Sequence, residues 1–169
     1  MMKIALMSDT HSYFDERFYR LFADVDEIWH AGDLGDIAVL EKLRAFKPTV
    51  AVYGNIDDYK IRTELKETER FTRDGADVLM THIGGYPGKY VPRVKAMLDA
   101  NAPQIFISGH SHILKVIYDK KYNLLHLNPG ACGISGFHHV RTALIFAIDN
   151  GAVKDMKVIE LGPRADVKK

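Results

Sequence analysis

Short apolar runs alternate with segments of helical periodicity along the first two-thirds of the chain, and this alternation restricts the fold more than any other feature. Runs typical of buried strands cover residues 3–8, 27–30, 49–53, 77–80 and 104–108. Apolar residues recur at helical spacing over residues 14–22, 37–45 and 92–100. Strands that alternate with helices build a parallel sheet with helices packed on its faces. The pattern therefore predicts an α/β fold.

The carboxy-terminal third has a different pattern, in which paired apolar runs flank short polar turns. Residues 115–118 and 124–127 flank one such turn, and residues 142–148 and 153–159 flank another. This arrangement predicts two antiparallel hairpins. Residues 65–72 are expected to form an edge strand.

Composition limits the class of protein. A chain of 169 residues that is 47% hydrophobic suits one domain, which we place at residues 1–162, followed by a flexible tail at residues 163–169. With 23 basic and 22 acidic residues, the charge balance favours neither a nucleic-acid polymer nor a membrane as partner. The amino-terminal apolar stretch is too short for a signal peptide or a membrane span, so we expect a cytoplasmic protein. The single cysteine, Cys132, excludes an internal disulfide and a cysteine-only zinc site.

Seven side chains that can bind metal ions follow the predicted parallel strands. They are Asp9, His11, Asp33, Asn55, His82, His110 and His112. In an open α/β sheet the carboxyl ends of the strands share one edge, so residues far apart in the sequence can meet there. Taken singly, Asp33 could cap a helix and Asn55 could occupy a left-handed turn. The ordered set, however, exceeds the needs of one ion and predicts a site for two.

The seven side chains divide between two ions if Asp33 bridges them. One ion then also takes Asp9, His11 and His112, and the other takes Asn55, His82 and His110. A shell of oxygen and imidazole ligands suits manganese, nickel, iron or zinc, and magnesium less well; manganese is the preferred candidate. Two ions roughly 3.5–4 Å apart can activate a bridging hydroxide as nucleophile and hold the oxygens of a phosphate ester. The predicted reaction is therefore phosphoester hydrolysis.

Five ordered motifs resemble those of the calcineurin-like metallophosphoesterases. They are Asp9-Thr10-His11, Gly32-Asp33, Gly54-Asn55, Thr81-His82 and Gly109-His110-Ser111-His112. The resemblance extends from about residue 3 to about residue 160. The short length and Asn128-Pro129-Gly130 are similar to the family's small phosphodiesterase branch, which is related to the retromer scaffold subunit. The resemblance implies a two-sheet β-sandwich flanked by helices, with a dinuclear metal site at the carboxyl ends of the strands.

One position departs from the family's pattern. Many members place a histidine directly after the asparagine, where it pairs with an aspartate and helps to protonate the leaving group. Here Ile56 stands at the histidine position and Asp36 at that of the paired aspartate. Isoleucine cannot donate a proton. The candidate catalytic residues are then Asp36 and His138, a loop residue that could substitute for the missing histidine.

The expected function is that of a metal-dependent phosphodiesterase acting on a small or nucleotide-like phosphodiester, with Asn55 also contacting the substrate. The alternatives are a phosphomonoesterase or phosphatase, and a catalytically weak scaffold protein of the retromer-subunit type. A nucleic-acid polymer is disfavoured as a substrate because no basic track is evident. The two carboxy-terminal hairpins offer edges through which the chain could form a homo-oligomer.

Overall fold

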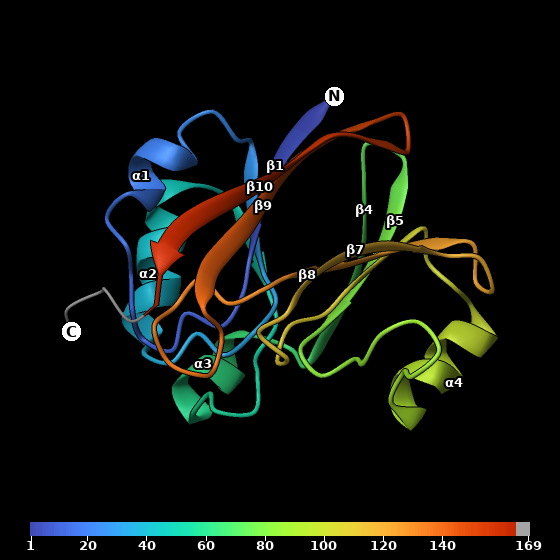
Figure 1. Cartoon of the computed structure of the whole chain (residues 1–169), viewed down its shortest axis with the longest axis horizontal. Coiled ribbons are helices and arrows are strands. Elements are labelled where there is room, and N and C mark those ends of the chain that lie inside the picture. Colours follow the sequence, from blue (N-terminus) through green and yellow to red (C-terminus); the bar gives the residue numbers. More distant parts are fainter. Residues whose placement is uncertain (165–169) are drawn as a thin grey trace.

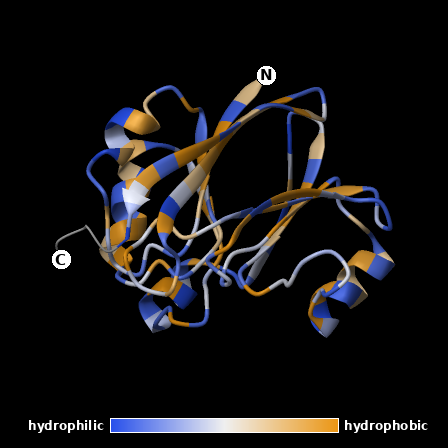
Figure 2. Cartoon of the chain, viewed as in Figure 1, coloured by the Kyte–Doolittle hydropathy of each residue, from blue (hydrophilic) through white to orange (hydrophobic). Residues whose placement is uncertain are grey.

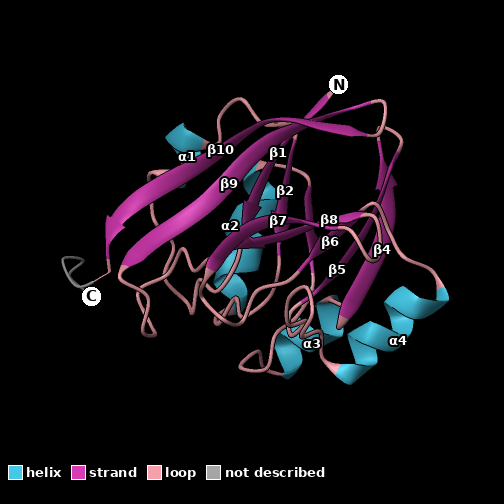
Figure 3. Cartoon of the chain, turned by 45° about the vertical axis from the view of Figure 1, so that its right-hand side comes forward, coloured by secondary structure: helices cyan, strands magenta, loops and turns pink. Residues whose placement is uncertain are grey.

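A computed structural model describes residues 1–164 of the protein, and its strands form two mixed sheets (Figures 1 and 3). The first sheet has the order β10 (Ala152–Pro163), β9 (Val140–Asp149), β1 (Met2–Met7), β2 (Glu27–His30) and β3 (Thr49–Ala51). The second has the order β4 (Thr68–Arg73), β5 (Ala76–Thr81), β6 (Ile105–Ile107), β8 (Leu124–Pro129) and β7 (Leu114–Asp119). The helices are α1 (Phe18–Leu21), α2 (Ile37–Phe46), α3 (Tyr59–Glu64) and α4 (Pro92–Ala100).

The alternating side chains of β1 show how the layers form. Ile4 and Leu6 belong to the core between the two sheets, whereas Ala5 and Met7 belong to the core beneath α1 and α2. This division follows from the two-residue period of a strand. On the far side of the second sheet, α4 covers a smaller core through Val94. The two-sheet α/β sandwich with flanking helices is thus confirmed, and Figure 2 shows hydrophobic residues along the central strands.

Parallel pairing brings the strand ends together. In the first sheet β1 pairs with β2 and β2 with β3, all parallel, and in the second β5 pairs with β6 and β6 with β8, also parallel. The polar residues predicted at strand ends therefore come from both sheets and not from one open sheet. The antiparallel hairpins are confirmed as β7–β8 and β9–β10, but they lie in different sheets.

Two local predictions differ from the structure, and one helix was not predicted. The helix expected over residues 14–22 contains only α1, and Phe14 lies before it, where its ring packs edge-on against Phe18. The edge strand begins at Thr68, because residue Lys66 instead forms an isolated parallel bridge with Val52. Helix α3 lies in a charged segment for which the sequence indicated no regular structure.

Within residues 1–164, no helix is long and apolar enough to cross a lipid bilayer. Strand β10 reaches Pro163, and the amide of Arg164 donates a hydrogen bond to the carbonyl of His139. The rest of the predicted tail, residues 165–169, lies outside the described residues.

Candidate metal centre

The loops after β1 and β2 are joined by backbone hydrogen bonds that bring the first candidate ligands together. The amide of Asp9 donates to the carbonyl of Gly32 at 3.0 Å, and the amide of His11 donates to the carbonyl of Asp33 at 3.0 Å. Asp9, His11 and Asp33 have φ angles of 56°, 45° and 59°, in the left-handed region that side chains usually avoid. Such strained positions persist where surrounding contacts hold them, and they cluster at functional sites.

The loop after β6 approaches the same point from the second sheet. His110 and His112 also have positive φ angles, of 69° and 62°. The amide of His110 donates to Asp9 Oδ2 at 3.1 Å, and the hydroxyl of Ser8 donates to the same oxygen at 2.6 Å. With Oδ2 held in this way, Oδ1 of Asp9 is left for other contacts.

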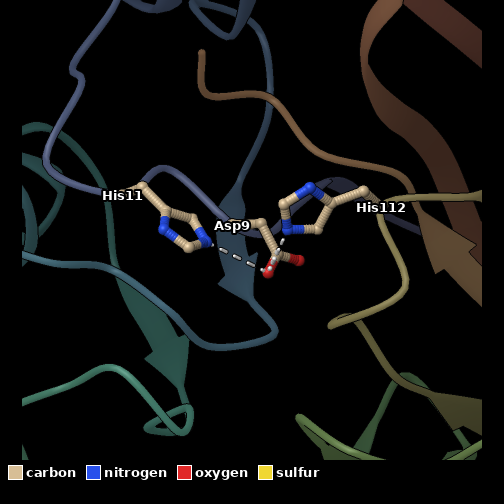
Figure 4. A group of neighbouring side chains, drawn as sticks. All are labelled: Asp9, His11 and His112. Carbon is tan, nitrogen blue, oxygen red and sulfur yellow. Dashed lines mark ion pairs between the residues drawn. The ribbon is translucent and has the colours of Figure 1, made fainter. Parts of the chain in front are cut away.

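Two groups of side chains result, and each has the geometry to hold a metal ion. Asp9, His11 and His112 form the first group, and Asp33, His82 and His110 form the second; the potential ligand atoms of each group lie within 4.8 Å of one another. In the first group, shown in Figure 4, Nε2 of His112 is 3.2 Å from Asp9 Oδ1. Asp33 lies between the groups, because its Oδ2 is 3.4 Å from Nε2 of His11 and 3.1 Å from Nε2 of His82.

The chemistry of these side chains fits divalent metal ions. Among the described residues, Oδ1 of Asp9 and Nε2 of both His11 and His82 are buried without a hydrogen-bond partner. Buried polar atoms are nearly always paired, so unpaired atoms that converge on one point indicate a missing partner. Carboxylate and imidazole together are the ligands that divalent transition metals prefer.

The pKa shifts at the centre also fit a site for cations. Burial alone would raise the pKa of Asp9, but the imidazoles of His11 and His112 hold it well below its usual range. Burial is likewise outweighed at Asp33, whose pKa is lowered by His11 and His82. In return, the nearby carboxylates of Asp33 and then Asp9 raise the pKa of His11 to about 9. Without metal, the carboxylates hold protons on their imidazole neighbours, and a divalent cation would displace those protons.

Hydrogen bonds at the outer ring nitrogens orient two of the histidines. Nδ1 of His82 lies 2.7 Å from the carbonyl of Ala31 and donates to it, so Nε2, which faces Asp33 at 3.1 Å, is the atom that would bind a metal after losing its proton. Nε2 of His138 lies 2.8 Å from the carbonyl of Gly133, so its Nδ1 accepts the hydrogen bond from Nδ1 of His112 at 3.2 Å. The Nε2 atoms of both His82 and His112 are then free to bind a metal.

Asn55 lies at the open side of the second group. Its Oδ1 is 3.0 Å from Nδ1 of His110, and both side chains are exposed. Asp36 lies elsewhere: it is exposed, and its carboxylate caps α2 by accepting a hydrogen bond from the amide of Ala38. The structure therefore brings together the seven candidate ligands and His138, but it does not place Asp36 with them. The catalytic role of Asp36 stays a prediction.

Asp57 is a residue of the site that the sequence interpretation missed. It belongs to none of the five motifs, and the structure buries it to 3% exposure. Its carboxylate accepts hydrogen bonds from the amides of Asp33, Gly35 and Gly54, at 3.1, 2.8 and 2.8 Å. It thereby joins the loop that carries Asp33 to the loop that carries Asn55. Gly54 permits this approach, since a Cβ there would collide with Asp33.

Comparisons with known proteins agree with this geometry. A family model described as the calcineurin-like phosphoesterase superfamily domain matches residues 2–151. A probable metallophosphoesterase of Methanothermobacter thermautotrophicus is 32% identical over 139 residues, which are 77% of each chain. An archaeal phosphodiesterase has a similar structure, with a TM-score of 0.76 at 22% identity over 95% of this chain and 100% of the other. Vps29 of Chaetomium thermophilum gives a TM-score of 0.73 at 16% identity over 95% and 97%.

Proposed function

The chain belongs to the calcineurin-like phosphoesterase superfamily, and we propose that it is a phosphodiesterase that requires two divalent metal ions. The observation that carries the proposal is the convergence of two ligand groups on unpaired buried atoms of Asp9, His11 and His82. Both groups retain all their metal-binding side chains, whereas loss of even one of these side chains would leave its group incomplete. The proposed substrate is a small or nucleotide-like phosphodiester.

In the proposed centre, Asp33 would help to hold both ions, because its carboxylate lies between the two groups. Asp9, His11 and His112 would hold the first ion, and Asn55, His82 and His110 would hold the second. Manganese is the first metal to test, followed by nickel, iron, zinc and magnesium. When bound, such ions supply positive charge that lowers the pKa of an attacking water and offsets the charge developing on the phosphate.

The protein's own groups have separate tasks in this proposal. His138 uses both ring nitrogens within the protein, so it orients His112 and is not free to donate a proton to a leaving group. The exposed amide of Asn55 stands where a phosphate oxygen of the substrate would arrive, and its Nδ2 can donate a hydrogen bond there. Asn55 thus serves substrate binding, and His138, on another loop, positions the metal ligand His112.

The preference for diesters rests on Ile56. Its backbone amide donates to Asp33 Oδ1 at 3.1 Å, while its side chain, 45% exposed, offers no proton. Asp36 stands where the family's pattern has the aspartate that pairs with this histidine, but here its side chain caps the start of α2. Because no proton donor stands at this position, we expect the centre to favour diesters and esters whose leaving group departs as a stable anion.

The test uses two chromogenic substrates, bis(p-nitrophenyl) phosphate and p-nitrophenyl phosphate, with added manganese or nickel. We expect the diester to be hydrolysed faster than the monoester, and we expect chelation or Asp33→Asn to abolish both activities. Faster monoester hydrolysis would favour the phosphatase alternative. Equal rates in all samples would remove the enzymatic proposal and leave the scaffold alternative.

A further inference from the structure

A cavity of about 330 Å³ lies beside the second ligand group, between α3 and α4. Figure 3 shows both helices at the same edge of the sandwich. Asn55 and His82 form the wall nearest the candidate metal centre, and Arg62 of α3 and Arg93 of α4 contribute the positive charge. We call this cavity the arginine pocket. Its volume lies at the lower end of the range of small-molecule sites, roughly 300–1,000 Å³.

Arg62 is held in a fixed orientation at the pocket. Its Nε donates to the carbonyl of Asp57 at 2.7 Å, and its guanidinium lies 4.7 Å from the centre of the Tyr53 ring. Its Nη2 makes only long contacts, of 3.5 and 3.4 Å, with the carbonyls of Gly54 and Asn55. A planar guanidinium held by one edge presents its remaining N–H groups in a geometry that matches phosphate.

Arg93 is held from the opposite side of the pocket. Its two terminal nitrogens donate to the hydroxyls of Thr81 and Thr68, at 2.9 and 3.1 Å. The one acidic residue lining the pocket is Glu67, whose carboxylate is 3.7 Å from Arg93 and whose side chain is 57% exposed. Two guanidinium groups against one carboxylate leave the lining positively charged.

We propose that the arginine pocket binds a second phosphate group of the substrate, separate from the diester that is hydrolysed. This inference rests on the proposed function, because Asn55 and His82 line the pocket and also belong to the site proposed to hold the scissile phosphate. Arginine recognises phosphate through paired, charge-assisted hydrogen bonds, which a neutral substituent cannot make. The pocket's size limits the occupant to a small group, so the substrate class is a nucleotide-like diester that carries a further phosphate.

The experiment compares the p-nitrophenyl ester of thymidine 5′-phosphate with and without a 3′-phosphate. For the wild-type protein with manganese, we expect the 3′-phosphate to lower KM about tenfold, the size of a charge-assisted contact. Arg93→Gln and Arg62→Gln should each remove most of that preference, and Arg62→Lys should keep part of it. Glu67→Gln should increase the preference, because it removes the opposing charge. Arg44→Gln is the control, since Arg44 forms an exposed ion pair with Glu64 of α3 outside the pocket.

A binding measurement separates this inference from the proposed function. In the presence of chelator, calorimetry should show that thymidine 3′-monophosphate binds at least tenfold more tightly than thymidine, which carries no phosphate. Arg93→Gln should remove that difference. If neither diester is hydrolysed, the proposed function fails, while this titration still decides on the pocket. Equal affinities for thymidine and its 3′-monophosphate, or a preference unchanged in both arginine variants, would overturn the inference.

Discussion

Replacing Asp57 with alanine should destabilise the protein and weaken metal binding, although the hydrogen bonds of Asp57 go to backbone amides. The substitution leaves three amides without their acceptor, those of Asp33, Gly35 and Gly54. An unsatisfied buried donor costs about 1–3 kcal/mol. Because water can enter the space that the carboxylate vacates, we use the lower part of that range. The expected loss of unfolding free energy is about 3–5 kcal/mol.

The effect on metal binding follows from the position of those amides. Two of them belong to the loop that carries Asp33, and the third precedes Asn55, so both loops lose their common anchor. Loss of a group that orients metal ligands typically costs 10–100-fold in affinity. Metal affinity is measured by competition with a fluorescent chelator, and stability by urea unfolding of the chelated protein.

The neighbouring Asp58 provides a matched control. Its carboxylate accepts hydrogen bonds from the amides of Lys60 and Ile61 and caps α3. Asp58→Ala should therefore cost about 1 kcal/mol, as for other helix caps, and should leave metal affinity unchanged. If Asp57→Ala costs no more than this control and binds metal equally well, the positioning role assigned to Asp57 is wrong.

Two further predictions concern acid stability and ligand orientation. Burial opposes ionisation of Asp15, but Arg17 and then Arg141 lower its pKa to about 2, below the unfolded value of 3.8. The ionised carboxylate therefore stabilises the fold above pH 4, and this stabilisation is lost as the pH falls towards 2. The difference in unfolding free energy between wild type and Asp15→Asn should shrink by about 2 kcal/mol over that interval, and a constant difference would refute this. Removal of the ring that fixes His112, by His138→Ala, should weaken manganese binding about tenfold in the same chelator competition, whereas the exposed neighbour His139→Ala should not.

The sequence predicted well those features in which local pattern and tertiary structure agree. The central parallel strands were visible because they are short apolar runs followed by polar residues, as in β1 followed by Asp9. The sheet edge that gathers those residues follows from parallel pairing. Local pattern could not assign strands to sheets, because β8 pairs with both its hairpin partner β7 and the distant β6.

The features that the sequence did not reveal depend on contacts between distant segments. Helix α3 buries only Ile61, so it has no apolar stripe that would distinguish it from a loop. Asp57 and Asp58 are adjacent and chemically identical, yet one is buried among three amides and the other caps a helix. Phe14 stands four residues before Phe18 and imitates a helical repeat, although the two rings pack across a turn. In each case the decisive partner lies outside the local pattern.

Anomalous diffraction from crystals grown with manganese would locate the two metal ions. Two peaks are expected beside the Asp33 carboxylate, one among Asp9, His11 and His112 and the other near His82 and His110. Strong manganese peaks elsewhere in the crystal, with none among these side chains, would contradict the proposed centre.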